Sequence, residues 1–373
     1  MLTGWQTVKN IGDVDSPALL FYPERIAENI RRTVAMAGGT GQLRPHIKTH
    51  KCAEVLRMQM AAGISKFKCA TIAEAEMAAA AGATDVLLAY QPSGPRSRRF
   101  VRLVEQFAPK TQFACIVDND ATMSELAGLA TSATGRLRVL VDIDCGQGRT
   151  GIPAGPRAFE LYKQICAQPK LEACGLHAYD GHIHESDFAA RKKNCDEAFM
   201  PVEALRNDLI AAGMNVPVIV AGGTPTFPIH AAREKRAHLE FSPGTNILWD
   251  AGYAKAFPDL DFLIAAVVLA RVASKPGERR LCLDVGHKAV ASEGPQLRIF
   301  FPELINSQVL MHNEEHLVVE AENGRDFKVG DALYGLPKHI CPTVALYNEA
   351  TIVKDGLAVE RWKIAGRDRR LSI

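Results

Sequence analysis

Strand-like and helix-like segments alternate along most of this 373-residue chain, and this alternation restricts its fold more than any other feature. Short apolar runs end in polar or glycine-rich turns, and amphipathic or alanine-rich stretches follow them. Eight strands are predicted, at residues 43–47, 66–70, 86–90, 112–117, 138–143, 172–178, 217–221 and 239–241. Eight consecutive βα units predict a closed parallel (β/α)8 barrel of the TIM-like type, with an open doubly wound sheet as the alternative.

The pattern changes after about residue 255, where helical periodicity disappears. Short β-rich runs separated by proline and glycine turns follow at residues 262–272, 280–284, 297–301, 317–320, 332–335 and 351–353. Such runs predict a β-domain. We therefore expect a barrel over residues 15–255 and a β-domain over 256–373, which residues 1–14 join.

The overall charge excludes several classes of partner. The net charge is +2, charged residues make up 23% of the chain, and no basic or acidic block occurs, so neither nucleic acid nor a membrane surface is an expected partner. The first residues lack the charged start and apolar stretch of a signal peptide. Nine scattered cysteines form no C-x-x-C pair, which is typical of thiols in a reducing cytoplasm.

A lysine at the end of the first predicted barrel strand is the leading catalytic candidate. Lys48 follows a short apolar stretch, and basic and polar residues, including His46, His50 and Lys51, lie on both sides of it in the sequence. The carboxyl ends of parallel strands are where α/β folds build their sites. Nearby positive charges lower the pKa of a lysine, and its neutral amine then serves as a nucleophile. The alternative is that these residues form an ordinary basic loop in water.

Two further strand ends carry polar residues. The fifth strand is followed by a glycine loop that contains a literal G-x-G-x-x-G at Gly146, Gly148 and Gly151. Because it lies in the fifth unit and prolines follow it, we interpret it as a loop that brings Arg149 to a ligand, not as a dinucleotide fingerprint. After the sixth strand, Tyr179 precedes two histidines, His182 and His184. These histidines either bind a ligand or are ordinary loop residues, and the sequence supports the two alternatives about equally.

The loops after the seventh and eighth strands both suit a phosphate group. Gly222-Gly223-Thr224 follows one strand, and Gly244-Thr245 follows the other. Small residues and hydroxyl groups let backbone N–H groups point at an anion, and barrels often bind phosphate after these two strands. A phosphorylated cofactor together with a nucleophilic lysine suggests pyridoxal 5′-phosphate.

A possible metal pair lies in the predicted β-domain. His339 and Cys341 are two residues apart, which on a strand or extended turn directs both side chains the same way. Imidazole and thiolate suit zinc, and two protein ligands would leave positions open for water and substrate. A surface histidine beside a core cysteine is the alternative.

These motifs together resemble the fold-type III pyridoxal-phosphate enzymes of the alanine racemase N-terminal superfamily, and in particular the D-threonine aldolase and D-serine dehydratase branch. The similarity runs from about Asp15 to the end of the sequence and rests on residues 44–51, residues 142–151, Tyr179, and the two phosphate-type loops. It implies an alanine racemase-like fold, a barrel with a C-terminal β-domain.

The resemblance also implies roles for individual residues. Lys48 would bind the cofactor covalently, and a catalytic role would fall to His182 as well. The cofactor would be contacted by His46, Arg149, Tyr179, Gly222, Gly223, Thr224, Gly244 and Thr245. A divalent metal, Zn, Mn or Mg, would bind at His339 and Cys341, and we expect a cytoplasmic homodimer.

The reaction is left with two main alternatives. The resemblance implies a lyase acting on D-β-hydroxy amino acids: a D-threonine aldolase giving glycine and an aldehyde, or a D-serine or D-3-hydroxyaspartate dehydratase giving a keto acid and ammonia. D-threonine aldolases often have His-x-Asp at the metal position, whereas the dehydratases look more like His-x-Cys, as here with Cys341. Less favoured are a racemase, with Tyr253 or Tyr334 as second base, and a non-catalytic cofactor-binding protein.

Overall fold

The computed structural model describes residues 4–234, 237–294 and 298–373. Its contacts divide the chain into two compact units: one contains residues 1–30, 49–52 and 245–367, and the other contains residues 31–48, 53–244 and 368–373. These groups differ from the expected domains, since residues 15–30 and 245–255 belong to the first unit. Of the residues 1–14 expected in the β-domain, 1–3 lie outside the described residues. The boundaries 15–255 and 256–373 stay a prediction.

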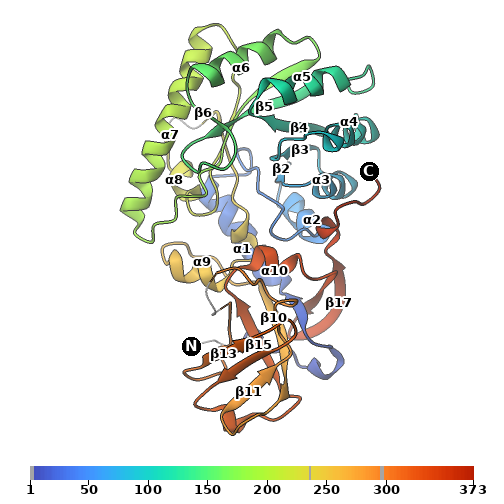
Figure 1. Ribbon diagram of the computed structural model, residues 1–373, viewed down its shortest axis with the longest axis vertical. Coiled ribbons are helices and arrows are strands. Elements are labelled where there is room, and N and C mark those ends of the chain that lie inside the picture. Colours follow the sequence, from blue (N-terminus) through green and yellow to red (C-terminus); the bar gives the residue numbers. More distant parts are fainter. Residues whose placement is uncertain (1–3, 235–236, 295–297) are drawn as a thin grey trace. The chain divides into compact units, whose positions relative to one another are not determined.

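The second unit is built around a parallel sheet with its helices outside it (Figure 1). The strands pair in the order β2 (Lys66–Cys69), β3 (Asp85–Leu88), β4 (Gln112–Val117), β5 (Leu137–Asp144), β7 (Leu171–Ala178), β8 (Ile219–Ala221) and β9 (Leu239–Phe241), and the short β6 (Ile152–Pro153) pairs with β5. The helices are α2 (Ala53–Ala61), α3 (Ile72–Ala80), α4 (Pro95–Phe107), α5 (Asp120–Leu129), α6 (Pro156–Ala167), α7 (Phe188–Ala211) and α8 (Phe227–Ala231). Each of these strands except β6 matches a predicted one.

Residues 42–47 join the two ends of this sheet. Leu43 forms a parallel bridge with Phe241 of β9, and His46 forms one with Lys68 of β2. Hydrogen bonds from the Arg44 N–H to the Phe241 carbonyl and from the Lys68 N–H to the Pro45 carbonyl, both 2.9 Å long, complete the connection. The expected strand 43–47 is thus reduced to two bridges, because Pro45 has no N–H to donate. The predicted barrel is confirmed.

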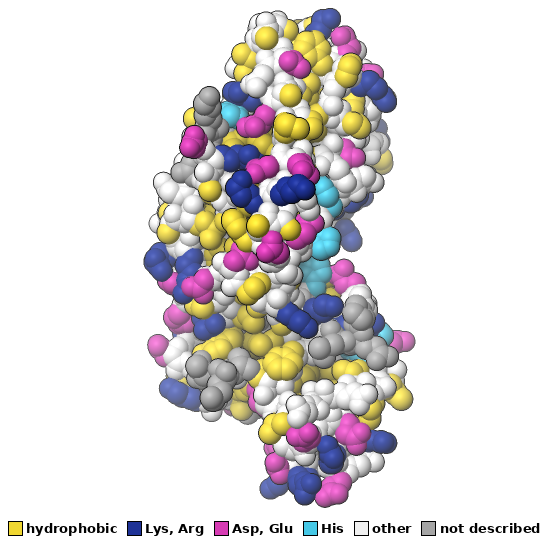
Figure 2. Space-filling view, turned by 90° about the vertical axis from the view of Figure 1, so that its left-hand side faces the viewer, with side chains coloured by type: hydrophobic (Ala, Val, Ile, Leu, Met, Phe, Trp, Pro, Cys, Tyr) yellow, Lys and Arg dark blue, Asp and Glu magenta, His cyan; other side chains and the backbone are white. Residues whose placement is uncertain are grey.

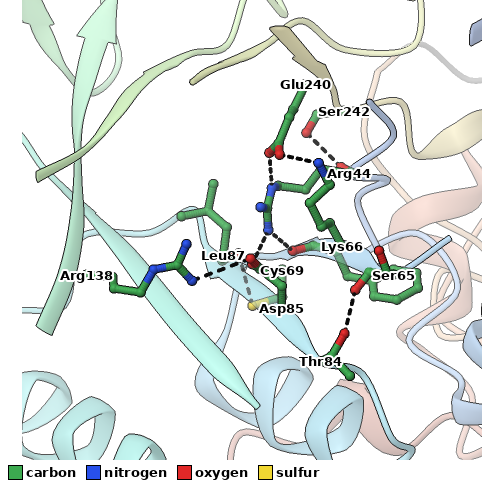
Figure 3. A network of polar contacts seen from close by, with 11 residues as sticks. Arg44, Ser65, Lys66, Cys69, Thr84, Asp85, Leu87, Arg138, Glu240 and Ser242 are labelled. Atoms are coloured by element: carbon green, nitrogen blue, oxygen red, sulfur yellow. Dashed lines mark hydrogen bonds and ion pairs between the residues drawn. The ribbon is translucent and has the colours of Figure 1, made fainter. Parts of the chain in front are cut away.

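A network of ion pairs lines the end of the barrel where the strands begin (Figure 3). Arg44 is 5% exposed, and its side chain lies 2.5 Å from Glu240 and 2.6 Å from Asp85. Arg138 and Lys66 extend the network, at 3.4 Å from Asp85 and 2.5 Å from Glu240. Above this layer the barrel interior is apolar, with Leu87, Ala114, Ile116, Leu140, Cys174 and Val220 in contact.

Local sequence accounts for where these helices begin. The Thr71 hydroxyl accepts a hydrogen bond from the Glu74 N–H, and the Glu74 carboxylate accepts one from the Ala70 N–H, so the two residues cap α3 reciprocally. The Asp187 carboxylate caps α7 by accepting from the Ala190 N–H.

The first unit contains a mixed sheet. Nine described strands form it: along its path lie β13 (Gln308–His312), β14 (Leu317–Glu320), β11 (Arg280–Leu283), β10 (Ala266–Ser274), β1 (Ala18–Phe21), β16 (Glu349–Lys354) and β17 (Leu357–Lys363), while β15 (Ala332–Pro337) pairs with β10 and β12 (Ile299–Phe300). Short helical turns are η1 (Ile11–Asp13), η2 (Thr245–Ile247), α9 (Ala251–Ala256), η3 (Gly324–Asp326), α10 (Ile340–Val344) and η4 (Ala365–Arg367), and α1 (Pro23–Ala37) follows β1. The predicted β-rich runs fall on this sheet, although Leu297 of the run 297–301 lies outside the described residues.

The surface is mixed in charge. On the face in Figure 2, acidic and basic side chains are interspersed with apolar and uncharged ones. Among the described helices, none combines the length and apolar character that a bilayer crossing needs.

Candidate active site

A cavity of about 520 Å³ lies at the carboxyl ends of the barrel strands. Residues at or just after the ends of segment 43–47, β2, β3, β4, β5 and β7 form its wall. Four of the residues singled out in the sequence share this cavity, namely His46, Lys48, Arg149 and Tyr179. The position agrees with the expectation that barrel enzymes bind ligands at this end.

Three cationic groups surround the ring of Tyr179. The Nζ atoms of Lys48 and Lys68 lie 5.6 and 5.5 Å from the ring centroid, and the guanidinium carbon of Arg149 lies 5.3 Å from it. Within the described part of the chain, none of these three side chains forms an ion pair with a carboxylate. These three cations are therefore available to pair with an anionic ligand, in a wall that also contains Asp118, Asp142 and Asp144.

Lys68 is the most deeply buried of these cations, with 1% of its surface exposed. Its Nζ lies 3.5 Å from Nε2 of His177, and Nδ1 of His177 lies 2.7 Å from a carboxylate oxygen of Asp142. Since a carboxylate only accepts, His177 carries a proton on Nδ1 and offers Nε2 to the lysine. Burial, followed by the charge of Lys48, lowers the pKa of Lys68 to about 7.

The glycine loop after β5 is held by Asp144. Its carboxylate accepts hydrogen bonds from the N–H groups of Gly146 and Gly148 at 3.0 and 3.1 Å, and burial is outweighed by these bonds, so its pKa is below the ordinary value. Gly148 has a φ of +63°, which favours glycine. The loop places Arg149 in the cavity wall.

His182 lies beside this loop and is not part of the cavity wall. A Cβ on Gly146 would be 3.0 Å from Nε2 of His182. Nδ1 of His182 is buried without a hydrogen-bond partner among the described residues, while the carbonyl of His182 lies 2.5 Å from Nδ1 of His184. The catalytic role of His182 stays a prediction.

The loops after β8 and β9 lie against each other. The Gly244 N–H donates to the Thr224 hydroxyl at 3.0 Å, and the Gly223 N–H donates to the Thr226 hydroxyl at 3.1 Å. The Gly222 N–H donates to the Ala178 carbonyl. These three N–H groups face the protein, contrary to the expectation that they point at an anion. Neither loop is part of the cavity wall, and Thr245 is buried like Thr224, so their phosphate role stays a prediction.

A buried polar cluster contacts the loop after β8. Asp180, which follows Tyr179, accepts a hydrogen bond from the Thr226 hydroxyl at 2.7 Å and lies 2.9 Å from Nε2 of His230. Burial opposes the charge of Asp180, but the hydrogen bond and charge of His230 hold its pKa below the ordinary value. Cys195 lies 3.5 Å from the same nitrogen. Among the described residues, Asp180, Cys195 and His230 are the group whose potential metal-ligand atoms lie within 4.8 Å of one another.

The predicted metal pair lies in the first unit. His339 precedes α10 in an extended conformation and Cys341 belongs to the helix, so the pair lies at a helix start, whereas a strand or an extended turn was expected. The Cys341 Sγ lies 3.2 Å from the Thr49 hydroxyl and 3.4 Å from the Thr245 hydroxyl. Burial opposes the thiolate, yet the hydrogen bond and charge of His339 and these hydroxyls lower the pKa of Cys341.

His339 carries matching features. Its Nδ1 lies 3.0 Å from the carboxylate of Glu293, which leaves Nε2 for another partner. Burial would lower its pKa, but Cys341 and then the carboxylates of Asp250 and Glu293 raise it to about 9. An imidazole nitrogen beside a sulfur that favours the thiolate is a donor set suited to zinc.

The cavity also fits pyridoxal phosphate. It holds the Lys48 amine, an aromatic face and two further basic side chains, and none of the three basic groups forms an ion pair with a carboxylate of the described residues. An aldehyde on an anionic aromatic ring requires such a set of groups. The racemase alternative gains no support from Tyr334, whose hydroxyl accepts the Val8 N–H at 3.0 Å inside an apolar cluster.

The residues predicted from the sequence for the site did not include three others of the cavity wall, Lys68, His177 and Asp142. Each lies near the end of a buried strand, on β2, β7 and β5 respectively. The sequence signal that could have found them is a charged or titratable residue in an otherwise apolar strand. Burying such a residue is costly unless it has a partner, so its presence there indicates a polar contact.

Comparison with known proteins agrees with this architecture. The sequence profile described as "Alanine racemase, N-terminal domain" matches residues 23–245, and that described as "Putative serine dehydratase domain" matches residues 265–353. A D-threonine aldolase from Arthrobacter sp is 31% identical over 95% of this chain and 93% of its own length. A 3-hydroxy-D-aspartate aldolase from Paracoccus denitrificans is 27% identical over 96% and 93% of the two chains.

Solved structures extend the comparison. The crystal structure of D-threonine aldolase from Filomicrobium marinum matches with a TM-score of 0.88 and 26% identity over 96% of both chains. An alanine racemase from Clostridium difficile matches with a TM-score of 0.70 at 14% identity, which speaks for the fold alone.

The closed ring of parallel strands, the lysine at its mouth and the additional sheet thus define an alanine racemase-like fold. The chain belongs to the family of the alanine racemase N-terminal domain, and it is a pyridoxal-phosphate-dependent enzyme of the lyase type.

Proposed function

We propose that this enzyme cleaves D-β-hydroxy amino acids and that its reaction is that of a D-threonine aldolase, which yields glycine and an aldehyde. The observation that carries the proposal is a cavity containing Lys48 and Tyr179 in a chain that is 31% identical to a D-threonine aldolase along nearly its whole length. The 3-hydroxy-D-aspartate aldolase relatives support the same class of substrate.

Lys48 is the residue proposed to hold pyridoxal phosphate covalently, through its amine. Its neighbour His46 lies in the same wall, Tyr179 offers a ring face, and Arg149 offers positive charge. The phosphate is assigned to the loops that carry Gly222, Gly223, Thr224, Gly244 and Thr245. When bound, the cofactor supplies an electron sink that stabilises negative charge at the substrate α-carbon.

His339 and Cys341 are proposed to hold a divalent metal, Zn, Mn or Mg. Glu293 orients the imidazole, and two hydroxyl groups stabilise the thiolate. When bound, the metal supplies a Lewis acid that makes a hydroxyl group easier to deprotonate. His182 is assigned the transfer of a proton through its imidazole.

A dehydratase that yields a keto acid and ammonia is the second candidate. A D-threo-3-hydroxyaspartate dehydratase from Delftia sp. is 26% identical over 94% of this chain and 97% of its own length. Among its solved structures are an alanine variant of a histidine and an alanine variant of a cysteine two residues further on, the latter described as metal-free. The spacing of His339 and Cys341 is the observation that favours this candidate.

Two measurements test the proposal. Adding pyridoxal phosphate to the protein should produce the visible absorbance of a lysine-bound cofactor, and Lys48→Ala should abolish it; a colourless wild type would refute the assignment. The loaded enzyme is then incubated with D-threonine and with D-serine, and glycine and keto acid are assayed. Glycine from D-threonine is expected, whereas keto acid without glycine would establish the dehydratase.

The assembly and location are proposed from the resemblance alone. We infer a cytoplasmic homodimer with a small D-amino acid as its substrate. Sedimentation of the loaded protein gives the mass that tests the dimer.

A further inference from the structure

The acidic side chains in the cavity wall are already satisfied by the protein. Each accepts a hydrogen bond from a nearby donor: Asp142 from His177 at 2.7 Å, Asp118 from the Gly151 N–H at 3.1 Å and Asp144 from the Gly146 N–H at 3.0 Å. The cations in the wall, Lys48, Lys68 and Arg149, have no such carboxylate partner within the described residues. These hydrogen bonds hold the carboxylates without cancelling their charge, and the three cations stay available to pair with an anionic ligand.

Lys68 differs from the other two cations in its surroundings. Its amine is fully buried, and among the described residues its one polar neighbour within hydrogen-bond distance is the His177 ring, which Asp142 orients. A buried ammonium without a carboxylate partner is costly, whereas a neutral amine that donates to Nε2 is not. An anion in the cavity would supply the missing counter-charge.

We propose that Lys68 binds an anionic group of the ligand and takes up a proton when that group enters, with Asp142 and His177 holding its amine toward the cavity. The inference rests on the proposed function, which supplies two anionic ligands for the cavity. The proton is taken from solvent, so the amine becomes an ammonium and no bond to the ligand forms or breaks.

Charged groups on several elements face this amine. They are Arg44 and Lys48 from the first segment, Asp142 on β5, His177 on β7 and Asp180 after β7. The two carboxylates favour the charged amine, but burial and the two cations outweigh them, so the pKa of Lys68 falls to about 7. A lysine in this balance changes its charge when one anion is added nearby.

The anion has two sources. One is the cofactor, through its phosphate or ring oxygen, and the other is the carboxylate of the amino acid substrate. Pyridoxine 5′-phosphate represents the first, because an alcohol replaces the aldehyde and no bond to Lys48 can form. 3-Hydroxybutyrate represents the second, because it has the carboxylate and hydroxyl of threonine without the amine.

Proton uptake is measured by titration calorimetry in buffers that differ in ionisation enthalpy. Pyridoxine 5′-phosphate is titrated into the cofactor-free protein, and 3-hydroxybutyrate into the protein loaded with pyridoxal phosphate. At pH 8 the free amine is mostly neutral, so at least one probe should bind with uptake of about one proton. At pH 6 the amine is already charged, and the uptake should be much smaller. The probe that shows uptake identifies the source.

Variants assign the proton to Lys68. Lys68→Met should bind the same probe at least about tenfold more weakly and without uptake, and Lys68→Arg, which is always charged, should bind it without uptake. Lys66→Met is the matched control, since this lysine of the same strand pairs with Glu240 and lies outside the cavity wall. It should retain the uptake of the wild type.

Several outcomes would overturn the inference. Uptake in Lys68→Arg equal to that of the wild type would place the proton elsewhere, and so would the absence of uptake with both probes. Neither result touches the proposed function, which depends on the visible absorbance with pyridoxal phosphate. A wild type that shows uptake but no such absorbance would refute the proposed function alone.

Discussion

Asp180 follows Tyr179 of the cavity wall and is hydrogen-bonded to the loop after β8. Its carboxylate accepts from the Thr226 hydroxyl, and this hydroxyl in turn accepts from the Gly223 N–H. His230 lies against the same carboxylate and packs edge-on against Phe199 of α7. Arg233 lies beside Cys195 and His230, so this cluster already contains a cation and is better suited to position the loop than to bind a metal.

Replacement of Asp180 should therefore weaken binding of the cofactor phosphate in particular. In Asp180→Asn the amide cannot accept from both Thr226 and His230, so the Gly222–Thr226 loop loses support. We expect affinity for pyridoxal phosphate to fall about tenfold, the equivalent of one lost hydrogen bond, with little change for pyridoxal, which has no phosphate. Dissociation constants from the visible absorbance give the ratio.

An exposed acidic residue on α7 provides the control for this variant. Glu197 lies 3.8 Å from Lys193 on the surface, and Glu197→Gln should leave both affinities unchanged. Equal losses for pyridoxal and pyridoxal phosphate in Asp180→Asn would contradict a role at the phosphate loop.

At the residue scale, a residue of the cavity can be predicted from the sequence when it lies in a recognisable turn motif. Lys48 and Arg149 follow strands in polar loops, and both line the cavity as expected. Lys68 and His177 lie within strands, where local pattern does not tell which side chain faces the barrel mouth. Their importance depends on contacts between β2, β5 and β7 that are far apart in sequence.

At the scale of elements, segment 42–47 closes the barrel with few backbone hydrogen bonds. Its side chains contribute a second connection, since Arg44 reaches Glu240 on β9 and Asp85 on β3 (Figure 3). Burial opposes the charge of Asp85, but the charge and hydrogen bond of Arg44 hold its pKa below the ordinary value. The ion pairs therefore help to keep the segment in register.

Arg44→Met should destabilise the protein strongly. The substitution leaves the buried Glu240 and the partly buried Asp85 without their main partner, and losses of this kind cost about 3–5 kcal/mol. Urea unfolding followed by circular dichroism gives the free energy of unfolding. Arg57→Met, which removes an exposed pair with Glu54, should cost less than about 0.5 kcal/mol. Equal stability of the two variants would show that the buried network does not hold the segment.

Two strands of the mixed sheet that were not predicted, β13 and β17, lie at the two ends of the path through it. Most of their residues are exposed or half-exposed, so neither has the alternation of apolar and polar residues that marks a half-buried strand. Central strands such as β10, buried over five consecutive residues, were visible as apolar runs.

At the scale of the whole molecule, the alternation of strand and helix over about two hundred residues was enough to predict the barrel, because it recurs in every βα repeat. The division into compact units was not visible in the same way. Residues 49–52 belong with residues 245–367, although they lie between Lys48 and α2 in the sequence. Membership of a unit depends on contacts between distant segments, which local patterns do not contain.

The proposed cofactor lysine and the two proposed metal ligands belong to different units, so cofactor and metal should each be removable without the other. Lys48 lies in one unit, and His339 and Cys341 lie in the other. A chelator should therefore remove the metal and abolish turnover while the visible absorbance of the bound cofactor persists. Lys48→Ala should remove the absorbance and keep the metal, and Cys341→Ala should do the reverse.

Metal content by atomic absorption and cofactor content by absorbance check this on the same samples. Cys166→Ala is the matched control for Cys341→Ala, since Cys166 is an exposed thiol and its loss should leave both contents unchanged. Because the Cys341 thiolate is the one sulfur ligand proposed, its removal should cost more metal affinity than a change at a residue that only orients a ligand, which is about 10–100-fold. Release of the cofactor by the chelator would contradict independent sites, and full metal content in Cys341→Ala would exclude this cysteine as a ligand.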